Sequence, residues 1–398
     1  MQAVIMVAGK STRTYPLTLT RPKPVLPALN KPLIFYNLDE LADIVDEVVL
    51  IVGYRKEMLR EIVGDQYRGM RIIYQEQKEQ LGTGHAVLQA QPHIRDRFIV
   101  MNGDDLFAGS DIRKLIAHPY SALAMEVDDP SQYGVIVTDD DDHLKEFVEK
   151  PETFVSKLTN VGCYVMEPDI FSILENLPLS ERGEIELPSA ILDVADTRPV
   201  KVIQLQGYWL PTGFPWDLLK TQKYLMDRDD RSEVVGRLEA GAVCTGKVLI
   251  EEGSVIQSGA VVQGPVHIAQ NSVVGEGSVV GPYTSIGAQV IVGKNTHLSG
   301  SLVMDGCEIE NGANIDHSVI GENVHIGENV HISTGLSDEQ NITSFVKGKN
   351  VDTGLKRLGA IIADDAVIGA ASKILPGCKI MPGLNVKASS TIREDLSE

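Results

Sequence analysis

Cysteine is scarce in this chain of 398 residues. The four that occur are widely separated and form no C-x-x-C pair (Cys163, Cys244, Cys307 and Cys378). Such scattering excludes a disulfide framework and argues against a structural zinc site. It favours buried free thiols in a reducing compartment.

Long apolar runs are also missing. No stretch approaches the roughly 20 apolar residues that a membrane-spanning helix needs. The N-terminus carries no basic region, and the apolar run after it is too short for a signal peptide. We therefore expect a cytoplasmic protein without a membrane partner.

Positive charge is in deficit. The chain has 36 Lys and Arg against 55 Asp and Glu, a formal net charge of −19. This balance argues against a large surface for nucleic acid or anionic membranes. A nucleotide substrate remains compatible with it, because a few local cations suffice to bind one.

Two common phosphate-binding patterns, G-x-x-x-x-G-K-[ST] and G-x-G-x-x-G, are absent near the N-terminus, because Gly9 is the only glycine of the first loop. The buried strand predicted at residues 3–7 leads instead into a run of small residues and then three cations: Ala8, Gly9, Ser11, Thr12, Arg13, Arg21 and Lys23. Small residues let backbone N–H groups approach a ligand. The stretch predicts either a polyphosphate loop or an ordinary basic surface loop.

Up to residue 228, strand-like and helix-like stretches alternate. Strands are predicted at 48–52, 71–74, 98–101, 123–127 and 161–166, and helices at 32–44, 56–63, 84–91 and 112–117. This alternation predicts an α/β domain with a Rossmann-like, mixed and mostly parallel sheet covered by helices on both faces. Ligands of such sheets bind beyond the carboxyl ends of the strands, where the loops after Val7 and Met101 fall.

From residue 229 to 398 the helical pattern is replaced by a repeat of six. Aliphatic residues recur at this spacing from Ile250 to Met304, then, after a slip in phase, at Ile309 and Ile315, again at Ile320, Ile326 and Ile332, and finally from Ile362 to Ile392. A period of six predicts an all-β parallel β-helix with three short strands per coil and the aliphatic residues inside. A chance run of Val and Ile in a β-sandwich is the alternative. We therefore divide the chain into domains 1–228 and 229–398.

A polar excursion between Gly335 and Gly359 interrupts the repeat. Loops of this length are usually functional or contact another subunit, although a solvated extrusion is an equal alternative.

The first loop resembles the signature of sugar-1-phosphate nucleotidylyltransferases, A-G-x-G-T-R-x-x-P-L-T followed by P-K-P, with Ser11 in place of the second glycine. Five later stretches resemble the family in order: 77–86 (Q-x-E-x-L-G-T-x-H-A), 103–104 (G-D), 133–134 (Y-G), 149–151 (E-K-P) and 160–164 (N-x-G-x-Y). The resemblance implies a nucleotide site at Ala8, Gly9, Ser11, Thr12, Gln77, Gly82 and Thr83. It implies a sugar-phosphate site at Gly134, Glu149, Lys150 and Asn160.

For catalysis, the resemblance implies that Arg13 and Lys23 stabilise the leaving pyrophosphate and that Asp104 holds Mg²⁺. A second position, besides Ser11, departs from the family. Its W-x-D-x-G motif, whose aspartate is a second metal ligand, aligns with Trp209–Gly213, where Pro211 cannot coordinate a cation. Either Asp104 holds the metal with phosphates and water alone, or another carboxylate such as Asp217 substitutes, or catalysis is impaired.

The whole layout resembles archaeal-type bifunctional enzymes with a uridylyltransferase domain and an acetyltransferase β-helix, and residues 351–359 match them well. This resemblance implies a left-handed β-helix and a homotrimer or pair of trimers. The acyltransfer residues do not carry over, because Asn311 falls where the family has its catalytic histidine. His325 and His331 only faintly indicate an alternative site.

We therefore expect an enzyme that forms an NDP-sugar and pyrophosphate from UTP or dTTP and a hexose or amino-hexose 1-phosphate, with Mg²⁺. One alternative is a non-catalytic subunit that binds nucleotide sugars. Another is an additional acetyl-CoA-dependent N-acetyltransferase activity in the β-helix.

Overall fold

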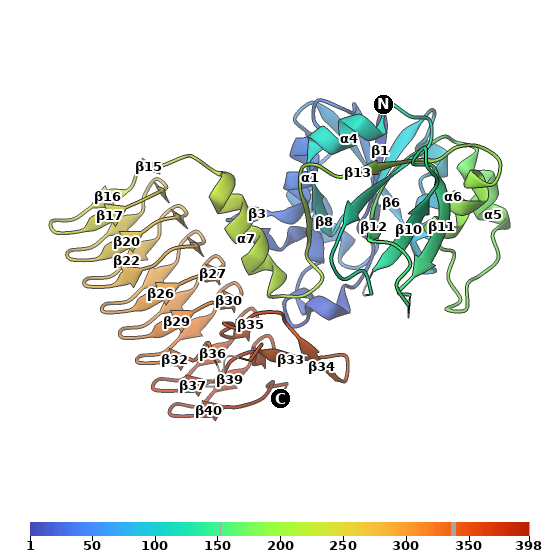
Figure 1. Ribbon diagram of the computed structural model, residues 1–398. Helices are drawn as coiled ribbons and strands as arrows, with labels where there is room; N and C mark the ends of the chain where they lie inside the picture. The colour runs from blue at the N-terminus through green and yellow to red at the C-terminus, as the bar shows by residue number, and fades with distance from the viewer. Residues whose placement is uncertain (132, 152, 336–339, 398) are drawn as a thin grey trace. The chain divides into compact units, whose positions relative to one another are not determined.

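The computed structural model describes residues 1–131, 133–151, 153–335 and 340–397 (Figure 1). The chain forms two compact units. One consists of Met1–Lys10 and Leu33–Pro211, and the other of Ser11–Pro32 and Thr212–Glu398. The segment Ser11–Pro32 (the inserted segment) thus joins the C-terminal unit although the chain on either side of it belongs to the first. The predicted boundary at residue 228 falls at the end of helix α7 (Asp217–Arg228) and stays a prediction.

The first unit is built on a ten-stranded mixed sheet. Four parallel strands form its centre, in the order β7 (Phe98–Asn102), β1 (Gln2–Met6), β4 (Glu47–Val52) and β6 (Met70–Glu76). The other strands are β5 (Gln66–Tyr67), β9 (Ser121–Glu126), β10 (Gly134–Thr138), β11 (Leu144–Glu149), β12 (Leu158–Met166) and β13 (Lys201–Gln204). Their pairings are antiparallel except for β13 with β9. The predicted Rossmann-like mixed sheet is confirmed.

Helices cover both faces of this sheet, as predicted. They are α1 (Leu33–Leu41), α2 (Lys56–Val63), α3 (Thr83–Leu88), α4 (Gly109–Leu115), α5 (Ile170–Asn176) and α6 (Leu187–Ala195). Tyr164 of β12 is buried in one core with α5 and α6, whereas burial and the nearby charge of Asp111 on α4 raise the pKa of its neighbour Cys163. Because successive strand residues point to opposite faces, α4 covers the face opposite α5 and α6 (Figure 1).

The second unit is a parallel β-helix. Twenty-four short strands, β15–β32 and β35–β40, form three parallel sheets of eight, and Figure 1 shows the coils stacked in chain order. The aliphatic residues of the repeat lie inside in one continuous core, from Val248 to Ile392. The six-residue period therefore predicted both the architecture and the interior side chains.

One interior position is corrected by the structure. Val266 pairs with Thr284, eighteen residues further on, whereas Ser285 pairs with Leu302, only seventeen residues further on. Because this coil is one residue shorter, Val303 occupies the core and Met304, which the count of six predicted, is buried outside it. The predicted slip in phase arises here, and the next coil is also seventeen residues long, because Val303 pairs with Ile320.

The polar excursion forms a β-hairpin of β33 (Thr343–Val346) and β34 (Lys349–Asp352) that leaves the stack of coils (Figure 1). Lys347 and Gly348 have left-handed backbone angles, which is the two-residue turn that suits a twisted hairpin. The Ser344 hydroxyl donates to the Gly377 carbonyl at 3.0 Å and fastens the hairpin to a later coil. Residues 336–339 of the predicted excursion lie outside the described residues.

All four cysteines are free thiols, as predicted, although Cys244 is only half-buried. Within the described ranges, no helix combines the length and apolar character that crossing a bilayer requires.

Candidate active site

The predicted site residues belong to both units, and the chain passes from one unit to the other after Lys10. In the first unit they are Ala8, Gly9, Gln77, Gly82, Thr83, Asp104, Gly134, Glu149, Lys150 and Asn160. In the second they are Ser11, Thr12, Arg13 and Lys23.

Asp104 lies at the carboxyl edge of the parallel strands, in the turn between β7 and the short strand β8 (Asp105–Phe107). The preceding Gly103 donates its N–H to the Met6 carbonyl at 3.0 Å. A Cβ atom on Gly103 would lie 2.2 Å from Val7 Cγ1, so only glycine lets this turn pack against the end of β1. Asp104 itself is half-exposed. The loops after Val7 and Met101 therefore meet, as predicted.

The predicted nucleotide-binding stretch is fastened to residues 184–187. Gly82 has φ 102°, and a Cβ on it would lie 2.5 Å from the Ile185 carbonyl oxygen. Gln77 is 5% exposed, and its Nε2 lies 3.2 Å from the Gly82 carbonyl and 3.1 Å from His85 Nδ1. The Gln77 side-chain amide is thus held between Gly82 and His85.

Two other predicted nucleotide-binding residues, Ala8 and Thr83, form hydrogen bonds within the protein. The Ala8 carbonyl accepts hydrogen bonds from Gln80 Nε2 at 2.9 Å and from the Tyr54 N–H at 3.1 Å. The Thr83 hydroxyl accepts the Leu187 N–H at 3.1 Å, at the start of α6. Both positions therefore fix the loops around the sheet edge. Gly9, between these loops and the inserted segment, is exposed.

Three of the predicted sugar-side residues lie together at the ends of β10, β11 and β12. Gly134 pairs with Glu149 across the β10–β11 hairpin, and a Cβ on Gly134 would lie 3.1 Å from Glu149 Oε2 and 3.9 Å from the Asn160 Cβ. The Asn160 side chain bonds the Tyr164 hydroxyl at 2.6 and 2.8 Å, and burial raises the pKa of that phenol. Lys150 follows Glu149 and is exposed.

Sequence reasoning missed a further cation on this side. Arg182, between α5 and α6, lies 2.9 Å from the Glu186 carboxylate. The hydrogen bond to Glu186 raises the pKa of Arg182, and the charge of Glu149 adds to this rise. A guanidinium therefore lies within electrostatic reach of Glu149. It stands in an irregular loop, so neither a motif nor a period could identify it.

The inserted segment begins with a strained residue. Ser11 has φ 49° and ψ 50°, the left-handed conformation that glycine adopts without strain, and it stands where the family signature has glycine. Its carbonyl accepts the Thr14 N–H at 2.9 Å and the Thr18 hydroxyl at 3.0 Å, which closes the turn. Thr12 opens the short 3₁₀ turn Thr12–Thr14.

Arg13 and Lys23 have different environments. Arg13 is exposed, and its guanidinium carbon lies 5.8 Å from the centre of the Phe214 ring, which stacks on Trp216. Lys23 is only 2% exposed. Burial raises the pKa of Asp217, and the charges of Lys220 and Lys23 oppose that rise, so Asp217 is a buried counterion within reach of Lys23.

Asp217 is therefore an unsuitable substitute metal ligand. Its Oδ2 accepts the Phe214 N–H at 2.8 Å, and its Oδ1 lies 3.6 Å from Lys220 Nζ. Its two carboxylate oxygens face a backbone amide and a lysine, whereas a metal ligand needs an oxygen that faces open space.

The structure also contradicts the prediction that Arg21 faces a phosphate. It is 7% exposed and forms ion pairs with Asp364 and Glu322 of the β-helix. Of the three cations from which a polyphosphate loop was predicted, Arg13 and Lys23 remain candidates.

Pro211 ends strand β14 (Trp209–Pro211), which pairs antiparallel with β8. Its partner in this register is Asp105, directly after Asp104. The position that the family gives to a second carboxylate is thus beside Asp104 and holds proline. Among the described residues, no group of three or more His, Cys, Asp or Glu side chains is arranged to hold a metal.

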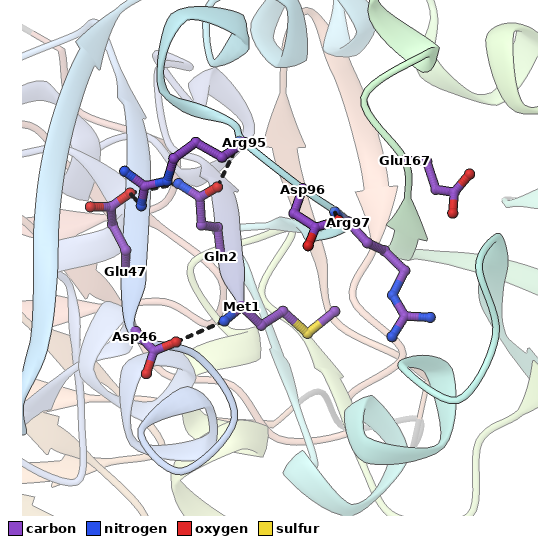
Figure 2. Close-up of a pocket in the computed structure, with 8 residues that line it drawn as sticks. All are labelled: Met1, Gln2, Asp46, Glu47, Arg95, Asp96, Arg97 and Glu167. Atoms are coloured by element: carbon purple, nitrogen blue, oxygen red, sulfur yellow. Dashed lines mark hydrogen bonds and ion pairs between the residues drawn. The ribbon is translucent and has the colours of Figure 1, made fainter.

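A cavity of about 450 Å³ lies elsewhere in the first unit (Figure 2). It is lined by Met1, Gln2, Asp46, Glu47, Arg95, Asp96, Arg97 and Glu167. Gln2 and Glu47 begin β1 and β4, so the cavity is at the amino edge of the parallel strands, opposite Asp104. Glu47 already bonds Gln2 and Arg95 there, and the lining mixes both signs of charge (Figure 2). It is not the predicted site.

Comparison with known proteins agrees with this geometry. The model of the nucleotidyl transferase family matches residues 2–228, and that of the GMPPB C-terminal domain matches residues 262–358. The chain therefore belongs to the nucleotidyl transferase family.

Its similarity to two curated archaeal proteins extends over its full length. It is 36% identical to the bifunctional protein GlmU of Methanocaldococcus jannaschii, covering 100% of this chain and 96% of the relative. It is 34% identical to the bifunctional sugar-1-phosphate nucleotidylyltransferase/acetyltransferase of Sulfurisphaera tokodaii, covering 100% and 98%. Among solved structures, UDP-glucose pyrophosphorylase complexed with UDP-glucose superposes with a TM-score of 0.53 at 25% identity, covering 57% of this chain and 99% of that one.

The left-handed backbone of Ser11 makes a testable prediction. Ser11→Gly should leave stability unchanged within about 0.5 kcal/mol, because relief of strain and the greater freedom of the unfolded chain offset each other. Ser11→Val should cost about 2 kcal/mol, because a β-branched residue is poorly accommodated at this φ. Urea unfolding of both variants measures the difference. Equal stability of the glycine and valine variants would contradict the strain.

Proposed function

We propose that this protein transfers a nucleotidyl group from UTP or dTTP to a hexose or amino-hexose 1-phosphate and releases pyrophosphate. The observation that carries the proposal is the Gly103–Asp104 turn, packed against the end of β1 where the signature loop begins. The solved neighbour with bound UDP-glucose supports a uridine nucleotide and a hexose. The homotrimer expected from the repeats belongs to the same proposal.

The reaction requires charge neutralisation more than covalent chemistry. A phosphate oxygen of the sugar 1-phosphate attacks the α-phosphorus of the triphosphate, and the bond to the pyrophosphate oxygen breaks. Because both reactants are anions, the protein must hold them in line and balance their charge. Arg13 and Lys23 would stabilise the leaving pyrophosphate. Lys150 would bind the attacking phosphate, while Glu149 and Asn160 would accept hydrogen bonds from sugar hydroxyls.

Asp104 suits a magnesium ion that is held mainly by the phosphates of the bound substrate. Mg²⁺ prefers oxygen ligands, keeps several waters, and is often bound through one or two carboxylates and substrate phosphates. The half-exposed Asp104 carboxylate at the sheet edge meets this requirement without a second protein ligand. When bound, Mg²⁺ supplies charge that offsets the negative phosphate oxygens.

Gln77 would favour uracil or thymine. Its Nε2 is held by Gly82 and His85, so Oε1 can accept a hydrogen bond from a base N–H. Uracil and thymine carry an N–H at N3, where cytosine has an acceptor. The same acceptor serves both bases, so it does not separate UTP from dTTP.

The first experiment measures pyrophosphate released from a panel of NTPs and sugar 1-phosphates with Mg²⁺. We expect release with UTP or dTTP and a hexose 1-phosphate, and none above background with CTP. If no combination releases pyrophosphate while NDP-sugars bind tightly, the non-catalytic alternative replaces this proposal.

Asp104→Asn should lower kcat about 100-fold, because the variant loses the proposed metal carboxylate with little change in shape. The matched control is Asp65→Asn, an acid whose side chain is 75% exposed and whose ion pair with Arg60 spans 3.7 Å. We expect the control to keep its rate within twofold. Full Mg²⁺-dependent activity in Asp104→Asn would show that the metal is held elsewhere.

Pro211→Asp should restore the missing carboxylate beside Asp104. We expect the Mg²⁺ concentration for half-maximal rate to fall about tenfold, a change of the size that metal-site partners cause. Pro211→Asn is the control, since it has similar size without the charge. An equal Mg²⁺ dependence of all three proteins would contradict a carboxylate position here.

Acetyl transfer is a second candidate, supported by full-length similarity to a named nucleotidylyltransferase/acetyltransferase. On the β-helix, His325 lies 3.4 Å from Glu308 and 3.2 Å from Glu310, a histidine between two carboxylates. Asn311, at the position of the family histidine, instead lies 3.2 Å from Glu328. Adding acetyl-CoA and amino-hexose 1-phosphates to the panel tests this activity by release of free CoA.

A further inference from the structure

The inserted segment is anchored to the β-helix at two places. Arg21 Nη2 lies 2.6 Å and Nε 3.3 Å from Asp364 Oδ2, and Nη1 donates to the Glu322 carboxylate. The Thr20 hydroxyl donates to the same Asp364 oxygen at 2.5 Å. Nine residues after Arg21, Asn30 Nδ2 donates to the Ile286 carbonyl at 2.9 Å.

These anchors extend over four neighbouring coils. Glu322 follows strand β30 (Val319–Ile320), and Asp364 follows β35 (Ile361–Ile362), its neighbour in the sheet. Asp364 Oδ1 also accepts the Glu322 N–H at 2.8 Å, which joins the two coils directly. Ile286 ends β24 (Thr284–Ile286), and the strand order is β24, β27, β30 and β35. Lys23 lies between the anchors.

Arg21 and Asp364 form a buried ion pair. The Arg21 and Asp364 side chains are 9% and 5% exposed. Burial acts to lower the pKa of Arg21, but the hydrogen bond to Glu322 and the charge of Asp364 outweigh it and raise the pKa, so the guanidinium stays charged. Loss of Arg21 would leave the buried Asp364 carboxylate without its cation, and loss of Asp364 would leave the buried guanidinium with Glu322 alone, so both changes are costly.

We propose that Arg21 is a positioning residue for nucleotidyl transfer, which acts by tying the inserted segment to Asp364 and Glu322 and thereby fixing Lys23. The inference rests on the proposed function, in which Lys23 stabilises the leaving pyrophosphate. Lys23 stands two residues after Arg21 and opens the short 3₁₀ turn Lys23–Val25. A displacement of a catalytic group by about 1 Å can lower the reaction rate about 100-fold. The contact of the inserted segment with the β-helix would therefore affect the rate of nucleotidyl transfer.

The test compares full-length wild type with Arg21→Ala, Asp364→Asn and the double variant in the pyrophosphate assay. Each single change should lower kcat at least tenfold with KM for the nucleotide changed less than threefold. The double variant should lose no more than the worse single variant, because both remove the same pair. Lys294→Ala is the control: it removes an exposed ion pair with Glu276 of the same β-helix and should stay within twofold of wild type.

Amide hydrogen exchange gives a readout that does not need activity. The Val25 and Leu26 amides donate to the Pro22 and Lys23 carbonyls at 3.1 and 3.0 Å. In Arg21→Ala they should exchange at least tenfold faster, while the amides of β1 and β4 keep their protection.

Three outcomes overturn the inference: kcat of both single variants within twofold of wild type, additive losses in the double variant, or unchanged exchange at Val25 and Leu26. If Arg21→Ala does not fold, Arg21→Lys, which keeps the charge but cannot bond both acids, takes its place in both measurements. A wild-type protein that releases no pyrophosphate contradicts the proposed function instead, and the exchange experiment then decides the role of Arg21 alone.

Discussion

A buried ion pair ties the inserted segment to the β-helix. The guanidinium of Arg21 is almost fully withdrawn from water, and only the carboxylates of Asp364 and Glu322 make that position tolerable. Removing one partner of such a pair typically costs about 3–5 kcal/mol, because the remaining charge stays buried and unpaired. The segment that carries Arg21 therefore belongs to the β-helix unit, although in sequence it lies between β1 and α1. The proposed pyrophosphate contacts Arg13 and Lys23 belong to that unit with it.

The same segment shows how far the site departs from its family signature. Ser11 keeps the left-handed turn without the glycine that adopts it freely, and the hydrogen bonds that its carbonyl accepts from Thr14 and Thr18 hold the turn closed. Pro211 stands where the family motif has a second carboxylate, and it pairs with Asp105, the residue after Asp104. Lys23 is buried, and its charge opposes the rise in the pKa of Asp217 that burial causes. The turn is thus maintained by local bonds, whereas the proposed metal position keeps one carboxylate, that of Asp104.

Most of the fold was predictable because it follows from local periods. The central strands and the helix at residues 56–63 agree with their apolar runs, and the period of six identified the interior of nearly every coil. The prediction that Met304 lies in the interior was wrong because one coil is a residue shorter. A strict count of six residues cannot detect such a deletion without the strand pairing. Within the site, the order of motifs identified Gly134, Glu149 and Asn160, which do lie together. Arg21 and Arg182 were missed as partners because their contacts depend on tertiary structure, and Arg21 is 343 residues from Asp364.

The composition of a phosphate-binding loop explains why such an anchor would be useful. A loop that binds phosphate needs small, polar and cationic residues, which bury little apolar surface and so offset little of the entropy lost when the loop is ordered. An interior of stacked aliphatic side chains is rigid by comparison, and two turns at its rim present the carboxylates of Glu322 and Asp364. Tying Arg21 and Asn30 to that rim gives the loop the rigidity that its own composition denies it. On this view the repeats are part of the nucleotidyl transfer machinery even where they carry no chemistry, so a truncated chain ending at residue 228 would retain the signature motifs yet lose the support that holds Lys23.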